Sequence, residues 1–275
     1  MHGLNWRSGL GLTVALTTVI TVSADQPVFN EMPRWDNGWG VQFVAEQRRE
    51  KDLMSGGRVV SAGFSEEVDL MHVEGVYTWD KSIRITAKLP LVMDAQREFP
   101  DGLGGKRIEH DKGVGDATLA LPLKRYFNLD GRSGSWTLAP QVRVPMGAKD
   151  NYTVYHRDWG TGISAGYETE TYRYLLSIGV DGWIFEGDAP ALASGHIDLG
   201  INFNLGKLSG HVKWETDYLA KEDGTEKLYI GPHLYLKLTD TVHAQLMYKR
   251  EAHARRNQLD HGNGTLTKLG IAFVF

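Results

Sequence analysis

Segments in which apolar and polar residues alternate one by one constrain the fold of this chain more than any other feature. Over 83–93 every second residue is apolar, with Arg84 and Lys88 among the residues between them. The same pattern recurs over 136–146 and 197–205. A period of two is that of a β-strand whose two faces meet different surroundings. Each apolar face runs for about ten residues, the length that a tilted strand needs to cross the hydrocarbon of a membrane.

The number and spacing of these segments predict the fold class: an all-β chain that forms a transmembrane antiparallel up-and-down β-barrel of about 12 strands. The strands are expected near 38–49, 65–79, 82–95, 114–127, 135–147, 158–168, 172–185, 195–205, 208–221, 227–238, 241–253 and 266–275. Short links are expected near 79–82, 128–134, 168–172, 205–208 and 238–241, and long polar loops near 50–64, 96–113, 148–157, 186–194, 222–226 and 254–265. Short turns at one end and long loops at the other are typical of outer-membrane barrels. An even number of strands puts both termini at the short-turn, periplasmic end.

The N-terminus has the pattern of a secretory signal peptide. Arg7 precedes an apolar run over 10–22, and the small residues at 22–24 fit a cleavage site. The alternative is a buried N-terminal helix. No later stretch approaches the roughly 18 apolar residues of a membrane-spanning helix. We therefore expect a signal peptide over 1–24, a periplasmic N-terminal segment over 25–37 and an outer-membrane β-barrel over 38–275.

Composition narrows the possible partners. The chain has 30 Lys and Arg against 34 Asp and Glu, a net charge of −4, which gives no electrostatic basis for binding nucleic acid. It has no cysteine, and a domain of this size closes a core without disulfides. A polar lumen beside an apolar outer face explains a mean hydropathy of −0.32 in a membrane barrel. The expected partners are outer-membrane lipid, the barrel-assembly machinery and a small-molecule solute, with no cofactor.

The last strand carries the most specific local signal. Lys268 is followed by Gly270, and Phe273 and Phe275 stand three and five positions after that glycine. This spacing resembles the signal that the barrel-assembly machinery of the outer membrane reads, with the terminal aromatic at the membrane interface. The alternative is an ordinary C-terminal strand of a soluble β-sandwich.

Aromatic residues near the predicted strand ends form a candidate interface girdle on the outward face. They are Trp39, Tyr77, Trp79, Phe127, Trp136, Trp159, Tyr172, Tyr174, Trp214 and Tyr218.

The opposite, inward face is rich in charged residues of both signs. The candidates for lining the lumen are Arg84, Lys88, Asp116, Lys124, Arg143, Glu168, Arg173, Asp181, Asp198, Lys213, Glu215 and Lys237. The same register turns further polar residues inward: Gln42, Glu46, Arg48, His72, Glu74, Gln141, His196, His211, Asp217, His233 and Lys249. Charges inside a barrel must be hydrated or paired. A water-filled path and a salt-bridged plug both satisfy that requirement.

Catalytic and metal sites are not predicted. Ser164 with one of the histidines would make a hydrolase-like pair, but the sequence has no nucleophile-elbow motif around it. The histidines of the expected loops, including His110, His156, His253 and His261, lack metal-ligand spacing along the chain. The prediction is therefore a protein that is not an enzyme, with no catalytic, cofactor or metal residues.

Three short motifs carry a family resemblance. The sequence over 113–127, GVGDATLALPLKRYF, resembles the Gly-x-Gly-Asp strand of the outer-membrane transporter family of the phenol meta-degradation pathway. The VRVPMG sequence over 142–147 is similar to a Pro-x-Gly element of that family, and Leu-Pro-Leu over 89–91 also fits. In layout the resemblance extends over 38–275. It implies transport of small, often aromatic or hydrophobic, molecules and carries over no substrate-binding residue.

Three functions follow as hypotheses. The leading one is a channel or transporter for small molecules. The second is a lipid-modifying barrel enzyme, and the third is a structural or adhesion barrel with a closed lumen, whose loops over 96–113 and 254–265 bind partners. If the first of these loops folds inward, its three glycines at 102, 104 and 105 make it a candidate gate.

Overall fold

The computed structural model describes residues 37–101, 103–129, 132–146, 154–155, 157–187, 189–206 and 208–275. The predicted signal peptide and nearly all of the predicted periplasmic segment lie outside the described residues. All regular elements in the described residues are β-strands. Within these same ranges, no helix is long and apolar enough to cross a membrane.

In the residues that the structure describes, thirteen strands follow one another. They are β1 (Gly38–Gly56), β2 (Arg58–Asp80), β3 (Ile83–Pro100), β4 (Lys106–Val114), β5 (Ala117–Ala120), β6 (Leu123–Leu129), β7 (Arg132–Val144), β8 (Gly160–Glu170), β9 (Tyr174–Phe185), β10 (Leu192–Asn204), β11 (Ser209–Lys221), β12 (Glu226–Lys237) and β13 (Val242–Val274).

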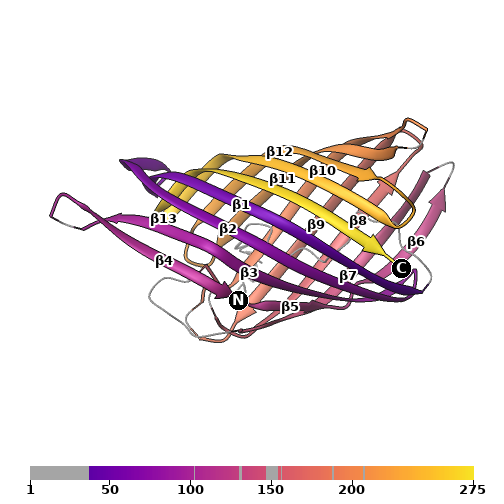
Figure 1. Cartoon of the computed structure of the whole chain (residues 1–275), viewed down its shortest axis with the longest axis horizontal. Coiled ribbons are helices and arrows are strands. Elements are labelled where there is room, and N and C mark those ends of the chain that lie inside the picture. The colour runs from indigo at the N-terminus through magenta and orange to yellow at the C-terminus, as the bar shows by residue number, and fades with distance from the viewer. Residues whose placement is uncertain are drawn as a thin grey trace, which may run out of the picture.

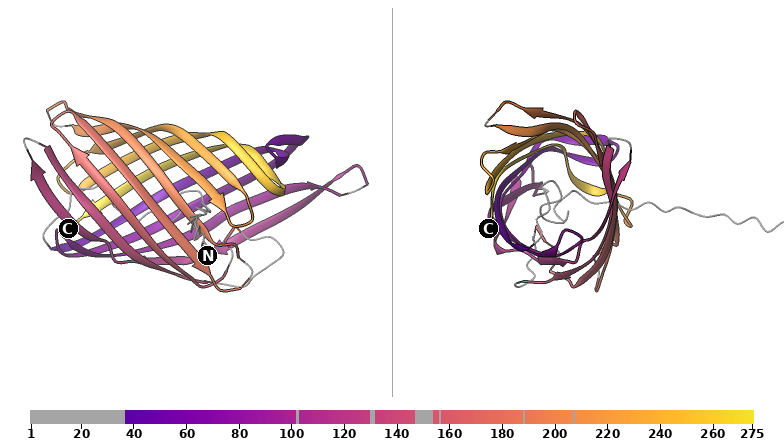
Figure 2. Two further views of the ribbon diagram at one scale, coloured as in Figure 1. Left: turned by 180° about the vertical axis from the view of Figure 1, so that it is seen from behind. Right: turned by 90° about the vertical axis from the view of Figure 1, so that its right-hand side faces the viewer.

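The strands close into a single antiparallel barrel (Figures 1 and 2). β1 pairs with both β2 and β13, and β2 pairs with β3, so the ring of strands is closed. β4, β5 and β6 pair in succession along β3, which makes them three segments of one interrupted strand of the wall.

β13 contributes two strands to the wall. It pairs with β12 as far as Arg255 and with β1 from Arg256 onward. The amide of Val274 donates to the carbonyl of Thr241 over 2.9 Å, so the two halves run side by side. Counting β13 twice and β4–β6 once gives the roughly 12 strands that the sequence predicts.

The two ends of the barrel differ as predicted. Turns of a few residues join β2 to β3, β6 to β7, β8 to β9, β10 to β11 and β12 to β13. The termini of the barrel lie at that same end, because the amide of Trp39 donates to the carbonyl of Phe275 over 2.8 Å. This short-turn end is the periplasmic end, and the opposite end is extracellular.

Three of the predicted extracellular loops are largely strand. The ranges 50–64, 96–113 and 254–265 extend the wall, with a single residue between β1 and β2. The outward face changes there from apolar to charged, as the exposed ion pair between Arg49 and Glu67 at 3.2 Å shows. Beyond the lipid both faces of a strand meet water, so the alternation that marks a strand in the sequence fades while backbone pairing continues.

The loop predicted to gate the barrel, over 96–113, is instead a hairpin. β3 and β4 project beyond the rest of the wall (Figure 1), and a short turn joins them. The carboxylate of Asp101 accepts hydrogen bonds from the amides of Leu103 and Gly105 in this turn. The prediction of an inward-folding gate at this position is wrong.

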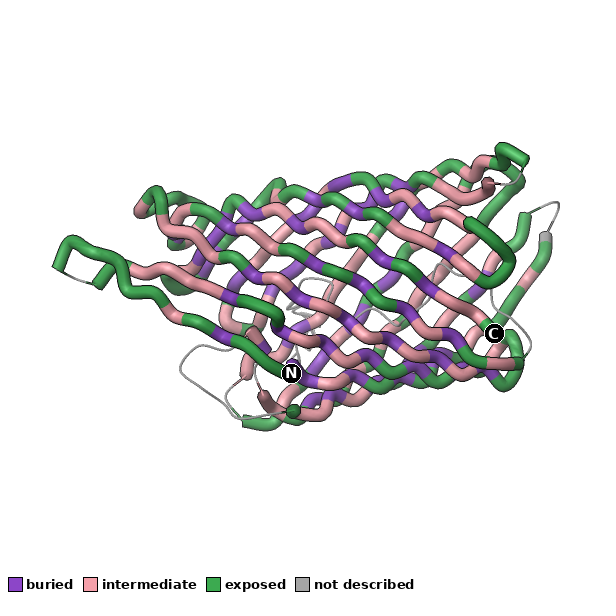
Figure 3. The backbone as a smooth tube through the Cα atoms, viewed as in Figure 1, coloured by how far each residue is buried: buried purple, intermediate pink, exposed green. Residues whose placement is uncertain are grey.

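Buried and exposed residues alternate along the strands (Figure 3). Exposed apolar side chains form a belt around the outside, including Phe43, Ile85, Ile197 and Leu269. Near the short-turn end this belt holds part of the predicted aromatic girdle: the ring of Tyr77 lies 4.6 Å from that of Trp39 and 5.1 Å from that of Trp79. Trp159 and Tyr218 of the predicted set lie toward the other end. A belt of this kind matches a hydrocarbon surround.

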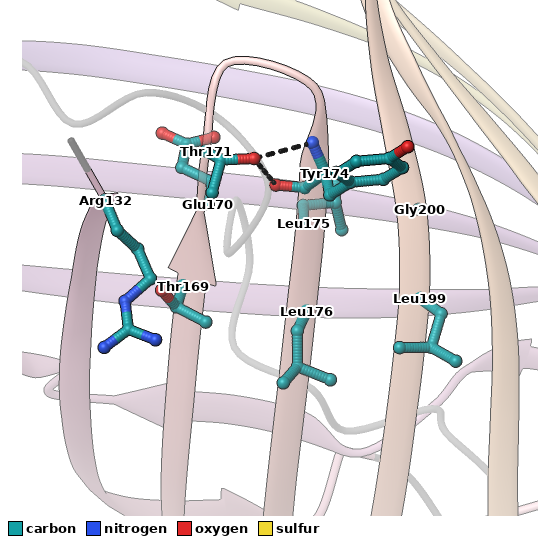
Figure 4. Close-up of a pocket in the computed structure, with 9 residues that line it drawn as sticks. All are labelled: Arg132, Thr169, Glu170, Thr171, Tyr174, Leu175, Leu176, Leu199 and Gly200. Carbon is teal, nitrogen blue, oxygen red and sulfur yellow. Dashed lines mark hydrogen bonds between the residues drawn. The ribbon is translucent and has the colours of Figure 1, made fainter. Parts of the chain in front are cut away.

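A shallow hollow of about 270 Å³ lies on this wall near the short-turn end (Figure 4). The outward-facing side chains of Tyr174, Leu176 and Leu199 line it, and the hydroxyl of Thr171 closes the adjacent turn by accepting from the amide of Tyr174 over 3.0 Å. Its apolar lining belongs to the outer belt.

Candidate functional site

The inward face of the barrel carries the polar residues. Along β2, for example, every second residue is buried from Val68 to Thr78, and these residues alternate with the outer belt. Side chains on strands that are not neighbours also meet, as the Lys227 ammonium of β12 and the Glu50 carboxylate of β1 do at 2.8 Å. Such a contact is possible only in the interior of the barrel. The interior is therefore the candidate functional site.

Most of the predicted lumen residues lie in this interior. Those that are buried are Arg84, Lys88, Asp116, Arg143, Asp181, Asp198, Lys213 and Glu215. Lys124 and Glu168 are partly buried, and their side chains form an ion pair with each other.

Two predicted lumen residues lie at the short-turn mouth. Arg173 is exposed in the turn between β8 and β9. The sequence predicts a strand from 172, but β9 begins only at Tyr174, so Arg173 is not part of the strand. Lys237 is the last residue of β12 and pairs with the exposed Asp240 at 2.6 Å. Neither belongs to the middle of the lumen.

A first ion-pair network, the Glu215 network, joins β10 to β13. It consists of Asp198, Lys213, Glu215, Asp217, His233 and Lys249, all buried. The Glu215 carboxylate accepts from Lys213 at 2.9 Å, Lys249 at 2.6 Å and His233 at 2.7 Å. Lys213 also reaches Asp198 at 3.1 Å, and Lys249 also pairs with Asp217. Each of these buried charges therefore has a partner of opposite sign.

A second network, the Glu46 network, joins β1, β2 and the end of β13. The Glu46 carboxylate contacts Arg48, His72 and Lys268, each at 3.0 Å. Lys268, which the sequence assigns to the assembly signal, thus also pairs inside the barrel. Unlike Lys268, the terminal Phe275 of that signal is exposed at the end of the barrel.

A third network, the Glu50 network, lies in the extracellular extension of the wall. Glu50 contacts Lys227 at 2.8 Å, the Tyr229 hydroxyl at 3.0 Å and Arg256 at 3.5 Å. Arg256 in turn pairs with Glu251 at 3.0 Å. This network is not predicted from the sequence, because the predicted strands end at 49 and 253, whereas β1 and β13 continue.

The connection from β7 to β8 sends a docked segment into the lumen: Val154, Tyr155 and Arg157. The Tyr155 ring packs in an apolar cluster with side chains of β2 and β3, namely Val68, Leu70, Val92 and Ala95. The amide of Val154 donates to Asp111 over 2.7 Å, and that of Arg157 donates to Asp116 over 3.0 Å. From the sequence, this connection is expected to be a solvated loop, so its docking is not predicted.

The Gly-x-Gly-Asp motif over 113–116 has a local structural role here. A Cβ atom at Gly115 would come within 2.6 Å of the Tyr155 ring, so only glycine leaves room for the docked segment. Gly113 has a φ of 118°, a conformation that favours glycine. Asp116 then supplies the acceptor for the Arg157 amide. The motif interrupts the wall strand between β4 and β5 and receives the segment.

Aromatic side chains with a nearby cation occupy two places in the interior. At the short-turn mouth, the Tyr235 hydroxyl and the His243 Nδ1 form a hydrogen bond of 2.5 Å, and the His211 ring stacks 4.8 Å from the Tyr235 ring. A hollow of about 430 Å³, the mouth hollow, lies beside them. It is lined by Tyr172, Arg173, Asn202, Phe203, Asn204, Ser209, Gly210, His211, Tyr235 and Lys237.

The second aromatic place lies nearer the extracellular end. The Arg143 guanidinium lies 4.8 Å from the centre of the Trp183 ring and 5.0 Å from that of Phe185. The two rings cover Gly160 and Gly162 of the neighbouring strand, where a Cβ atom would come within 2.6 Å of them. Two cation–π contacts hold the arginine against the wall.

Ser164, considered above for a hydrolase-like pair, has no histidine directly opposite it on either neighbouring strand. It lies in register with Ala139 on one of these strands and with Asp181 on the other.

No family model matches the sequence, and no curated protein matches it. Among solved structures, the chain is similar to the COG4313 outer membrane channel from Pseudomonas putida F1, with a TM-score of 0.68 and 16% identity over 92% of this chain and 100% of that one. The Beta domain of the Bordetella autotransporter BrkA gives a TM-score of 0.47 at 13% identity over 88% and 100%. Pseudomonas aeruginosa OccD3 gives 0.36 at 7% identity over 94% and 92%. The last two are too distant to inform the strand arrangement. The chain therefore has the fold of an outer-membrane β-barrel, and its apolar belt places it in the outer membrane of a Gram-negative bacterium.

Proposed function

We propose that this barrel is a channel for small aromatic or hydrophobic molecules. The observation that carries the proposal is the direction of the ion pairs in the lumen. In the Glu215 and Glu46 networks the pairs lie within one strand or join strands that are neighbours or next but one. Such pairs run along the wall, whereas a salt-bridged plug needs pairs between opposite walls. A wall that satisfies its own charges leaves the axis of the barrel to water and solute.

Two inward-facing aromatic side chains, each beside a cation, support an aromatic or hydrophobic solute. Tyr235 beside Lys237 lies at the short-turn mouth, and Trp183 beside Arg143 lies nearer the other end. An aromatic face stacks on a planar solute, and a cation attracts a carboxylate or a π-system. The resemblance to a transporter family and the similarity to a solved channel agree with this proposal.

The test is single-channel conductance of the refolded barrel, residues 25–275, in a planar bilayer with benzoate added as a probe. We expect steady conductance that benzoate interrupts, and a Tyr235→Ala variant that conducts but is interrupted for shorter times. A barrel that is folded and heat-resistant in detergent, yet never conducts, would overturn the proposal.

A barrel with a closed lumen is the second candidate function, because Tyr155 of the docked segment occupies part of the interior. The two candidates separate in the same recording. A closed structural barrel stays silent in both the native chain and a Tyr155→Ala variant. A channel narrowed by the docked segment conducts more when Tyr155 is removed. Neither candidate involves catalysis or a cofactor.

A further inference from the structure

Three potential metal ligands meet in the extracellular extension of the barrel, outside the lipid belt. Glu66 comes from β2, and Asp260 and His261 come from the middle of β13. One ligand atom from each lies within 4.8 Å of the other two. Glu66 is far in sequence from the consecutive residues Asp260 and His261, which is why the spacing of histidines along the chain gives no sign of this group. β1 runs between the strands that supply them.

The orientation of the His261 ring directs a lone pair into this group. The side chain is fully buried, and its Nε2 lies 2.8 Å from the carbonyl oxygen of Glu98. A carbonyl only accepts hydrogen bonds, so Nε2 carries the proton and Nδ1 of the neutral ring carries a lone pair.

That lone pair has no hydrogen-bond partner. Nδ1 of His261 is buried and unsatisfied, and the nearest Asp260 oxygen lies 3.9 Å away. A buried nitrogen without a hydrogen-bond partner is unfavourable in a folded protein unless a ligand binds it. A histidine whose other nitrogen is fixed by a carbonyl is the usual arrangement of a metal-binding imidazole.

The positive side chains around this group have other acidic partners. Arg48 acts on Glu66 but pairs with Glu46 at 3.0 Å, and Arg97 acts on His261 but pairs with Glu109 at 3.0 Å. The Nε of Arg256 lies 4.0 Å from Asp260. That guanidinium already donates to the His261 carbonyl over 2.7 Å and pairs with Glu251 at 3.0 Å and with Glu50 at 3.5 Å. The Asp260 side chain is 39% exposed, so an ion has a path from the external solution.

We propose that Glu66, Asp260 and His261 bind a divalent transition-metal ion of the Zn²⁺ class. An imidazole nitrogen with two carboxylates suits such an ion, whereas Ca²⁺ and Mg²⁺ prefer oxygen ligands alone. Water completes the coordination. The ion pins the β1–β2 hairpin to the middle of β13 and, through the Glu98 carbonyl, to β3. This site does not depend on whether the barrel conducts.

The test is isothermal titration calorimetry of ZnCl₂ into the refolded, detergent-solubilised barrel. We expect one saturable site that CaCl₂ does not occupy. His261→Ala abolishes this binding, and Asp260→Asn and Glu66→Gln weaken it while preserving side-chain shape. His253→Ala, an exposed histidine on the same strand, is the matched control and leaves binding unchanged.

Two results would overturn the proposal: no saturable Zn²⁺ binding by the native barrel, or equal binding by the His261→Ala and native proteins. Heat-modifiable migration on a gel shows whether each variant folds. If His261→Ala does not fold, Asp260→Asn decides, because its side-chain oxygen still accepts from the His261 amide while its charge is lost. Unchanged affinity in a folded Asp260→Asn variant then counts against the site.

Discussion

The Glu215 network and the docked segment are both inside the barrel, but they are held in different ways. Glu215 sits on a regular strand, and its partners Lys213, His233 and Lys249 come from that strand or from strands at most two away. The docked segment lies on the other side of the interior. It is attached by hydrogen bonds, by the Arg157–Asp111 ion pair at 3.9 Å and by one aromatic ring, that of Tyr155. The network is therefore part of the wall, whereas the segment packs against a wall whose strands pair without it.

The first way to test this difference is to break the network at its centre. Glu215→Ala leaves Lys213, Lys249 and His233 buried without their shared partner. Removing one member of a buried ion pair costs about 3–5 kcal/mol of stability. We expect a loss of that size in the free energy of unfolding, measured by urea titration of the barrel in lipid vesicles.

The matched control is Glu67→Ala, which removes an exposed carboxylate paired with Arg49. We expect a loss of less than about 1 kcal/mol there, because exposed ion pairs are screened by water. If Glu215→Ala and Glu67→Ala cost the same, the interior of the barrel is hydrated enough that the wall gains little from the Glu215 network.

The same comparison explains how much could be predicted from the sequence. Glu215 and Lys213 follow from strand periodicity alone, because an inward position is fixed by counting in twos. Tyr155 does not follow, since its burial depends on a contact with strands about 60 to 90 positions earlier. Glu50 and Arg256 escape prediction for another reason: outside the lipid, the two faces of a strand no longer differ in polarity.

The second prediction concerns the docked segment. Tyr155→Ala removes the ring that packs against Val68 and Val92, so the segment loses its apolar anchor. Truncating a buried aromatic side chain costs about 3–5 kcal/mol of free energy. We expect this loss to weaken the docking of the segment and not the stability of the wall, because the wall strands pair with one another without the segment. We expect a higher single-channel conductance with little change in the unfolding midpoint of the barrel.

Tyr248→Ala serves as the control, because Tyr248 is 47% exposed on the outer face of the wall, between the buried Met247 and Lys249. It should leave conductance unchanged. If Tyr155→Ala conducts no more than this control, the segment does not narrow the path. If Tyr155→Ala instead unfolds the barrel, the segment is part of the wall, and the distinction from the Glu215 network disappears.

The smallest expected effect lies at the short-turn mouth, where neither a buried network nor a docked segment is present. Lys237 is 40% exposed there and pairs only with an exposed aspartate. Lys237→Ala should leave stability unchanged, since such pairs contribute little. If Lys237 attracts the carboxylate of an aromatic acid, its removal shortens benzoate interruptions of the current by up to about fivefold at low salt.

The salt dependence of the benzoate interruptions separates electrostatic attraction by Lys237 from stacking on the Tyr235 ring. Raising the ionic strength to about 1 M reduces the Debye length to about 3 Å. The native barrel should then behave like Lys237→Ala, because the charge is screened while the Tyr235 ring is untouched. Lys81→Ala, which removes a lysine from another turn at the same end, is the control for the general charge of the mouth. An equal effect of both substitutions would mean that the mouth attracts anions as a whole, and that the hollow beside Tyr235 has no special part in it.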